Sequence, residues 1–173
     1  MERKAIDTLI IKVDDVYNVH LDKACQILRM GGLVAFPTET VYGLGALATN
    51  PEAVMKIFKV KGRPSDNPLI VHIANINEIG SIAYLDDRYI EVIRKITPGP
   101  ITFVLKKKES IPDEVSAGLD SVGVRIPAHP IAQKLISCSG PIAAPSANRS
   151  GRPSPTDARA VIEDLNGLIE CII

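Results

Sequence analysis

The sequence lacks tryptophan, has an aromatic content of only 4%, and carries no net charge, because 20 Lys and Arg balance 20 Asp and Glu. A neutral chain argues against a protein whose main task is to coat nucleic acid, since such proteins need a basic excess to neutralise phosphates. A net charge of zero is still compatible with a local basic patch that binds a small anion. The length of 173 residues is typical of one domain, which buries roughly 70% of its unfolded surface.

Cysteines and long apolar runs are also scarce. Cys25, Cys138 and Cys171 lie far apart and include no CxxC pair. Their odd number and spacing predict neither a disulfide framework nor a zinc site, and their apolar surroundings predict buried, inert thiols. No apolar run reaches the ~20 residues that span a bilayer, and the N-terminus lacks the apolar segment of a signal peptide. We therefore predict a cytoplasmic protein with no membrane contact.

Strand-like and helix-like segments alternate along the chain. Strands are predicted at residues 8–13, 33–36, 69–74, 101–105, 122–126, 142–144 and 168–173, and helices at 21–30, 51–60, 87–96, 130–138 and 157–165. Asn50 and Thr156 are predicted to cap the helices that follow them. The alternation predicts an α/β domain with a twisted, mixed sheet. Clusters of Pro and Gly predict loops at residues 37–45, 61–68, 98–100 and 145–155, and active sites of α/β folds are built on such loops.

The loop at residues 37–45 gathers Thr38, Glu39, Thr40 and Tyr42 between strand-like segments. A carboxylate among hydroxyls suits an ammonium group and a small polar side chain, and a plain polar turn is equally compatible with this composition. The number of glycines and the missing GK[ST] exclude a dinucleotide fingerprint and a P-loop.

A basic stretch lies at residues 53–64, which hold four cations and no acid. Lys61 and Arg63 flank Gly62 at the start of a Pro-bracketed loop. A lysine that acts as a point charge and an arginine that donates two hydrogen bonds would form a polyphosphate clamp. The alternative is a basic helix C-terminus that complements the helix dipole.

Polar residues also lie within or directly after apolar strands. His72 is structural by its pattern, and it becomes a candidate substrate contact if it faces the basic loop. Arg125 needs an anionic partner, which is either an internal carboxylate such as Glu39 or a ligand. Ser146 and Asn148 follow a buried strand with one residue between them, so they point the same way in an extended segment. Ser146 does not lie in GxSxG, which argues against a serine hydrolase, and no pair of histidines has metal-ligand spacing.

The motifs PTETVYGLG, KGRPSDNPLIVHI, PGPITFVL, VGVRIP and PIAAPSANRSGRPSPT occur in this order between about residues 21 and 165. Together they closely resemble the YrdC-like threonylcarbamoyl-AMP synthases. The resemblance implies an open, twisted mixed sheet with flanking helices around a large basic cavity. It also implies that residues 1–173 form a single YrdC-like catalytic domain, cut short at its C-terminus and without a second domain.

The resemblance further implies a nucleotidyltransferase that joins L-threonine, bicarbonate and ATP into threonylcarbamoyl-AMP and releases pyrophosphate. Mg²⁺ would arrive on the nucleotide without a metal site held by the protein, and the product would pass to a complex that modifies adenosine in tRNA. Position by position, the resemblance implies catalytic roles for Lys61 and Arg63, ATP binding by Lys61, Arg63, Ser146 and Asn148, and L-threonine binding by Thr38, His72, Arg125 and Ser146. Such chemistry needs no protein nucleophile, because holding the reactants together and neutralising charge at phosphorus suffice.

Two other functions are compatible with parts of the pattern. An RNA-binding module could use the basic cavity, but the neutral charge and the few aromatics disfavour it, and direct tRNA binding stays open. A carbamoyl-transfer domain, as in hydrogenase-maturation carbamoyltransferases, is disfavoured because the zinc-finger-type cysteines of that system are absent. The run of lysines at residues 106–108 predicts a solvated sheet edge more than an RNA contact.

Overall fold

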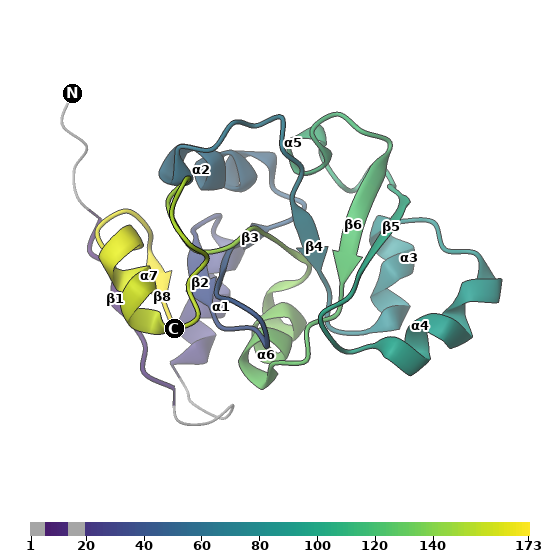
Figure 1. The fold of residues 1–173 in the computed structure, drawn as a ribbon, viewed down its shortest axis with the longest axis horizontal. Helices are drawn as coiled ribbons and strands as arrows, with labels where there is room; N and C mark the ends of the chain where they lie inside the picture. The colour runs from purple at the N-terminus through teal and green to yellow at the C-terminus, as the bar shows by residue number, and fades with distance from the viewer. Residues whose placement is uncertain (1–5, 14–19) are drawn as a thin grey trace.

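The computed structural model describes residues 6–13 and 20–173, and these form an eight-stranded mixed sheet flanked by helices (Figure 1). The strands are β1 (Leu9–Ile10), β2 (Val34–Phe36), β3 (Gly43–Leu47), β4 (Ile70–His72), β5 (Thr102–Lys106), β6 (Ser121–Arg125), β7 (Ile142–Ala144) and β8 (Cys171–Ile172). The helices are α1 (Leu21–Arg29), α2 (Pro51–Lys61), α3 (Ile79–Ile82), α4 (Ile90–Ile96), α5 (Asp113–Ser116), α6 (Pro130–Ser139) and α7 (Ala158–Leu165), with short 3₁₀ helices η1 (Ile76–Glu78) and η2 (Asp87–Tyr89). In this described part of the chain, no helix is both long and apolar enough to cross a membrane.

The strand order is β1-β8-β2-β3-β7-β4-β6-β5. The pairs β1/β8, β2/β8 and β4/β6 are parallel, and the remaining pairs are antiparallel. The α/β class and the mixed sheet are confirmed. The lysine run at residues 106–108 begins at the end of β5, the last strand of the sheet, where charged side chains discourage pairing with another chain.

Local capping explains the limits of α2 and α7. The side chain of Asn50 accepts a hydrogen bond from the Ala53 N–H at 3.1 Å, and Gly62 ends α2 in the left-handed region, with φ 64°. The prediction that Thr156 caps α7 was wrong. Asp157 is the cap and accepts a hydrogen bond from the Ala160 N–H at 2.9 Å. Both residue types can cap a helix, so their order alone does not decide between them.

Strand β3 lies partly within the stretch that was predicted as a loop at residues 37–45. Its two glycines give it a low intrinsic strand propensity, but close packing of the sheet requires one of them. A Cβ atom at Gly45 would lie 2.6 Å from the side chain of Ile142 and 2.8 Å from the ring of Phe36. Tertiary packing therefore determines this strand, and a single-sequence pattern does not reveal it.

Helices cover the two faces of the sheet unequally. On one face, α1 and α6 pack against β2, β7 and β8 through one apolar cluster. On the other face, α2, α3, α4, α5 and α7 contribute to a second, larger cluster that reaches from β2 to β6. Figure 1 shows α7 and α4, which both belong to the second face, at opposite ends of the molecule. Of the described helices, the first face carries only α1 and α6, so it is covered over only part of its width.

Alternating burial along β5 and β6 identifies the uncovered part. Val122 and Val124 are buried in the larger cluster, while Thr102 and Val104 are exposed, Val104 by 74%. Strand register places the following residues on the same face as Ile142 and Ala144, and none of them belongs to the cluster that α1 and α6 form: Ile70, His72, Thr102, Val104, Lys106, Ser121, Gly123 and Arg125. We call this set the open face.

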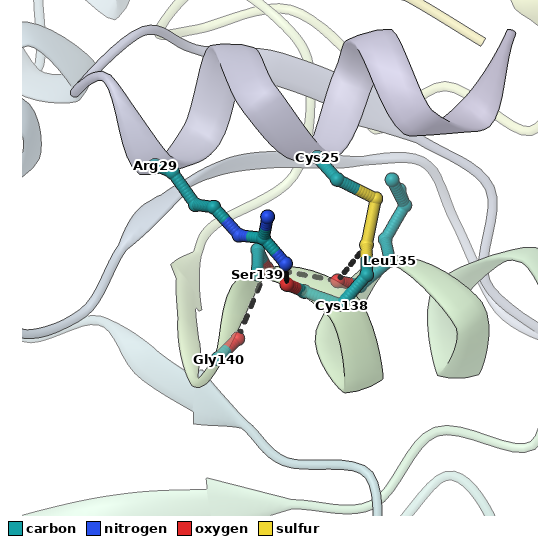
Figure 2. Close-up of a disulfide and its surroundings, with 6 residues drawn as sticks. All are labelled: Cys25, Arg29, Leu135, Cys138, Ser139 and Gly140. Atoms are coloured by element: carbon teal, nitrogen blue, oxygen red, sulfur yellow. Dashed lines mark hydrogen bonds between the residues drawn. A yellow bond between two sulfur atoms is a disulfide. The ribbon is translucent and has the colours of Figure 1, made fainter.

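A disulfide joins Cys25 of α1 to Cys138 of α6, with the two Cα atoms 6.0 Å apart (Figure 2). The prediction of unpaired, inert thiols was therefore wrong for these two residues. They are 113 residues apart in sequence and become neighbours only because α1 and α6 pack on the same face of the sheet. Arg29 of α1 also donates a hydrogen bond to the carbonyl of Cys138. Cys171 is free and buried as predicted, and burial raises its pKa to about 12.

Loss of the disulfide is expected to destabilise the chain. Because the bridge closes a loop of 113 residues, replacing Cys138 by serine should lower the free energy of unfolding by about 2–4 kcal/mol. Denaturant unfolding with and without a reductant measures the effect. Reductant should destabilise the wild type by a similar amount and leave Cys138→Ser unchanged, and a wild type that is insensitive to full reduction would contradict this expectation.

Candidate functional site

The predicted site residues form two groups in the structure. One group surrounds Lys61 at the end of α2 and includes Arg63, Ser146 and Asn148. The other surrounds Arg125 at the end of β6 and comprises Thr38 and His72.

Lys61 is the last residue of α2 and is only 4% exposed. Its Nζ atom donates hydrogen bonds to the carbonyls of Ser146 and Asn148, so it ties the helix to the segment after β7. Burial lowers the pKa of Lys61 to about 8, the charge of Arg63 acts in the same direction, and Asp164 opposes the shift. The ammonium group is therefore still largely protonated at pH 7.

Arg63 follows the left-handed Gly62 and is held loosely. Its Nη2 atom lies 3.3 Å from the carbonyl of Asn67 and 3.4 Å from that of Pro68, while its Nε atom is buried without a partner among the described residues. Arg63 lines a cavity of about 680 Å³ beside α2, which also contains Lys56 and Lys59. Its Nη1 atom makes no hydrogen bond within the described residues, so this atom is the donor left for an anion.

Ser146 and Asn148 lie in the segment that Lys61 holds. Ser146 pairs with Gly43 in an isolated β-bridge, and its hydroxyl makes no hydrogen bond within the described residues. Asn148 is buried, and its amide nitrogen donates to the carbonyls of Arg149 at 2.9 Å and Arg152 at 2.8 Å. Its Oδ1 atom has no partner among these residues. The segment thus keeps polar groups that could contact a substrate.

Asp164 of α7 also contacts this segment, a role that sequence patterns did not indicate. Its carboxylate forms an ion pair with Arg152 and accepts a hydrogen bond from the Arg149 N–H at 3.0 Å. It thereby fixes the chain directly after Asn148. The sequence pattern alone does not distinguish Asp164 from Glu163, the neighbouring acid on the same helix.

The second group depends on a contact between β6 and the loop after β2. The Nη2 atom of Arg125 lies 2.6 Å from Oε1 of Glu39 and 3.1 Å from the hydroxyl oxygen of Thr40. The other oxygen of Glu39 accepts a hydrogen bond from the Ala128 N–H at 3.1 Å. Of the two anionic partners considered for Arg125, an internal carboxylate and a ligand, the structure shows the internal one, Glu39.

The ionisation of Glu39 follows from these contacts. Burial alone would raise its pKa, but hydrogen bonds from Arg125 and from the backbone, together with the charge of Arg125, hold the pKa below its ordinary value. Glu39 is thus an anion at neutral pH.

Thr38 shapes the loop that carries Glu39. Its hydroxyl donates to the carbonyl of Val41 at 2.6 Å and accepts hydrogen bonds from the N–H groups of Thr40 at 3.2 Å and Val41 at 3.3 Å. These contacts close a tight turn of the kind that threonine hydroxyls favour. In the structure, the hydroxyl predicted to contact L-threonine therefore stabilises the loop.

His72 pairs with Arg125 in the register between β4 and β6, so it belongs to the open face. It is 5% exposed, its Nδ1 atom lies 3.2 Å from the carbonyl of Ile70, and its ring meets the ring of Phe36 edge to face. Burial lowers its pKa to about 4, and the charge of Arg125 adds to this effect. His72 is therefore a neutral group at the side of Arg125.

The lowered pKa of His72 is expected to make stability depend on pH. An unfolded histidine binds its proton near pH 6.5, whereas folded His72 does so only near pH 4, so folding is favoured fully above pH 6.5 and less as the pH falls towards 4. The free energy of unfolding should fall by at most roughly 3 kcal/mol. Denaturant unfolding at pH 7.5, 6 and 4.5 measures it. Subtraction of the same series for His72→Gln isolates the contribution of His72, and parallel curves for the two proteins would contradict the expectation.

Within residues 6–13 and 20–173, no group of three or more His, Cys, Asp or Glu side chains could hold a metal ion. The polar groups of the site are cations, hydroxyls, an amide, a neutral imidazole and the paired carboxylates of Glu39 and Asp164. Such a set is suited to binding anions.

Comparison with known proteins identifies the family. The model of the Sua5/YciO/YrdC family, described as "Telomere recombination", matches residues 26–173. The chain belongs to the Sua5/YciO/YrdC family. The family resemblance inferred from the motifs is thereby confirmed.

Three relatives of this Sua5/YciO/YrdC chain show how far the similarity extends. A threonylcarbamoyl-AMP synthase of Pyrococcus abyssi is 53% identical over 169 residues, which are 96% of this chain and 50% of the relative. One of Bacillus subtilis is 50% identical over 87% of this chain and 44% of the relative. The crystal structure of P. abyssi Sua5 complexed with L-threonine is 49% identical, with a TM-score of 0.88, and covers 97% of this chain and 49% of that one. The chain thus spans about half the length of the relatives it matches here.

Proposed function

We propose that this chain synthesises threonylcarbamoyl-AMP from L-threonine, bicarbonate and ATP, with release of pyrophosphate. The observation that carries the proposal is the match of 96% of the chain, at 53% identity, to a protein named for this activity. The arrangement of the site supports it, because the two groups of side chains offer one set of donors suited to a carboxylate and another suited to phosphates.

In this proposal, the open face binds L-threonine. The guanidinium of Arg125 pairs with the substrate carboxylate through its Nη1 atom, since a charge-assisted hydrogen bond is about twice as strong as a neutral one. Its Nη2 atom is already bound by Glu39 and Thr40, and its Nε atom is buried. Ser146 provides a hydroxyl, Thr38 shapes the loop that carries Glu39, and His72 provides a neutral polar group beside Arg125.

The group around Lys61 binds ATP and provides the catalytic charge. Lys61 and Arg63 neutralise the phosphates, and Ser146 and Asn148 add hydrogen-bonding groups. Catalysis then comes from holding the threonine-derived carbamate against the α-phosphorus and from stabilising the charge that develops there. Because the described residues contain no carboxylate cluster for an ion, we assign Mg²⁺ to the nucleotide phosphates, where it is usually bound.

The wider setting is part of the same proposal. Residues 1–173 would act as a single catalytic domain around a basic cavity, in the cytoplasm, and would pass the product to a complex that transfers the threonylcarbamoyl group to tRNA. Part of the argument for a cytoplasmic location was that the cysteines are unpaired. The Cys25–Cys138 disulfide removes that part, since disulfides are rare in most cytosolic proteins.

Calorimetric titration with L-threonine, L-serine and ATP tests the substrate class. The proposal requires saturable binding of ATP and binding of L-threonine that is tighter than that of L-serine. Equal heats for the two amino acids, or no binding of either, would contradict it. Salt-sensitive tRNA binding without any effect of ATP would instead favour an RNA-binding module.

A further inference from the structure

We propose that Glu39 is a positioning residue that holds the guanidinium of Arg125 in the orientation that receives the L-threonine carboxylate. This inference rests on the proposed function and extends it to a residue that is not part of the predicted site. Glu39 touches the substrate-binding arginine and acts through it.

Glu39 connects three parts of the site with one carboxylate. One oxygen binds Arg125 at the end of β6, and the other binds the N–H of Ala128 in the connection to α6. The loop that carries Glu39 is closed by the Thr38 hydroxyl, and Thr40 of the same loop binds the same Nη2 atom of Arg125. The loop after β2 and the chain around β6 are thus fixed to one another around the guanidinium.

An arginine that binds a small substrate gains from such restraint. A free arginine side chain loses about 2 kcal/mol of rotamer entropy when it is ordered, and a binding site that is already ordered avoids this cost during binding. The side chain of Arg125 is 13% exposed and that of Glu39 21% exposed, so solvent weakens their ion pair less than it weakens a surface pair. Because Glu39 and Thr40 both bind Nη2 and the Nε atom is buried, the Nη1 atom is left for the substrate carboxylate.

The charge of Glu39 also decides between positioning and proton transfer. A carboxylate whose pKa is held below its ordinary value is a weak base, so it is poorly suited to accept the proton of the threonine ammonium. Its negative charge is, however, well suited to hold a guanidinium. Loss of Glu39 should therefore weaken binding of L-threonine and leave the chemical step intact.

Steady-state kinetics of Glu39→Gln separate these roles. The amide keeps the shape of the side chain and an acceptor for the Ala128 N–H, but it loses the charge-assisted bond to Arg125. The KM for L-threonine should rise about tenfold while kcat at saturating L-threonine stays within about twofold, since charge-assisted bonds are roughly twice as strong as neutral ones. In a background of Arg125→Ala, the same change should lower kcat/KM for L-threonine no further.

Glu170→Gln is the matched control, because the carboxylate of Glu170 accepts a backbone hydrogen bond from Leu33 at 2.7 Å and lies outside both groups of site residues. Its KM for L-threonine should stay at the wild-type value. An unchanged KM in Glu39→Gln, or a fall in kcat without a rise in KM, would overturn the positioning role. A wild-type chain that binds no L-threonine in the calorimeter would overturn the proposed function itself, and with it this inference.

Discussion

Replacing Lys61 by alanine is expected to abolish threonine-dependent release of pyrophosphate while the chain remains folded. The change removes a buried ammonium group and both of its hydrogen bonds to the segment that contains Ser146 and Asn148. It therefore removes a positive charge next to the proposed phosphate site and releases the polar groups on the other side of that site. Removing one preorganised donor costs about 10²–10³ in kcat in enzymes that stabilise a charged transition state, and we expect a loss at least that large.

Lys107→Ala is the control for this variant. The Nζ atom of Lys107 also donates to a backbone carbonyl, that of Ile111 at 3.0 Å, and the residue lies outside both groups of site residues. This variant should keep wild-type turnover. Circular dichroism and thermal unfolding check that Lys61→Ala is folded, since two carbonyls without a partner cost about 1–3 kcal/mol each when they are buried. A folded Lys61→Ala protein with wild-type turnover would show that Lys61 is structural only.

Replacing Arg125 by alanine is expected to weaken L-threonine binding by at least about 30-fold. The variant loses the only guanidinium that the structure places on the open face, and it leaves Glu39 without its partner. The charge pair that decides the affinity is the one between Arg125 and the substrate carboxylate. Truncating one member of a partly buried, hydrogen-bonded charge pair typically costs about 2–5 kcal/mol or more, which corresponds to a loss of affinity of about 30-fold to several thousand-fold. Calorimetric titration with L-threonine measures the effect, and binding of ATP by the same variant should be changed much less.

Arg88→Ala provides the matched control for Arg125→Ala. Arg88 is also paired with a carboxylate, that of Asp86 at 2.7 Å, but both side chains are exposed, by 79% and 44%. Its loss should leave L-threonine binding unchanged. If Arg125→Ala bound L-threonine as tightly as Arg88→Ala does, the open face would not be the threonine site.

Sequence patterns revealed the parts of the fold that local chemistry determines. Asn50 caps α2 as predicted, and Gly62 ends it, because capping and left-handed glycine are local properties. Strand β3 and the Cys25–Cys138 bridge were missed, because each depends on neighbours that are distant in sequence. Periodicity reports which face of an element is apolar, but it does not report which other element will cover that face.

The same distinction applies to the site. The contact between Arg125 and Glu39 could be predicted because an arginine in an apolar strand must find an anion, and Glu39 was a named candidate. The role of Lys61 as a tie between α2 and the segment after β7 could not be predicted, because the basic stretch suggested only a charge that faces a ligand. The turn closed by Thr38 was likewise hidden, since a threonine hydroxyl serves a turn and a ligand equally well.

The most direct measurement is the detection of the adenylate product itself. The chain is incubated with L-threonine, bicarbonate, ATP and Mg²⁺, and the mixture is analysed by mass spectrometry for threonylcarbamoyl-AMP and by a coupled assay for pyrophosphate. We expect both products in equal amounts, and neither when L-threonine, bicarbonate or ATP is omitted or when Lys61→Ala replaces the wild type. A folded wild-type chain that forms no threonylcarbamoyl-AMP, in an assay where the P. abyssi synthase does, would contradict the proposed function.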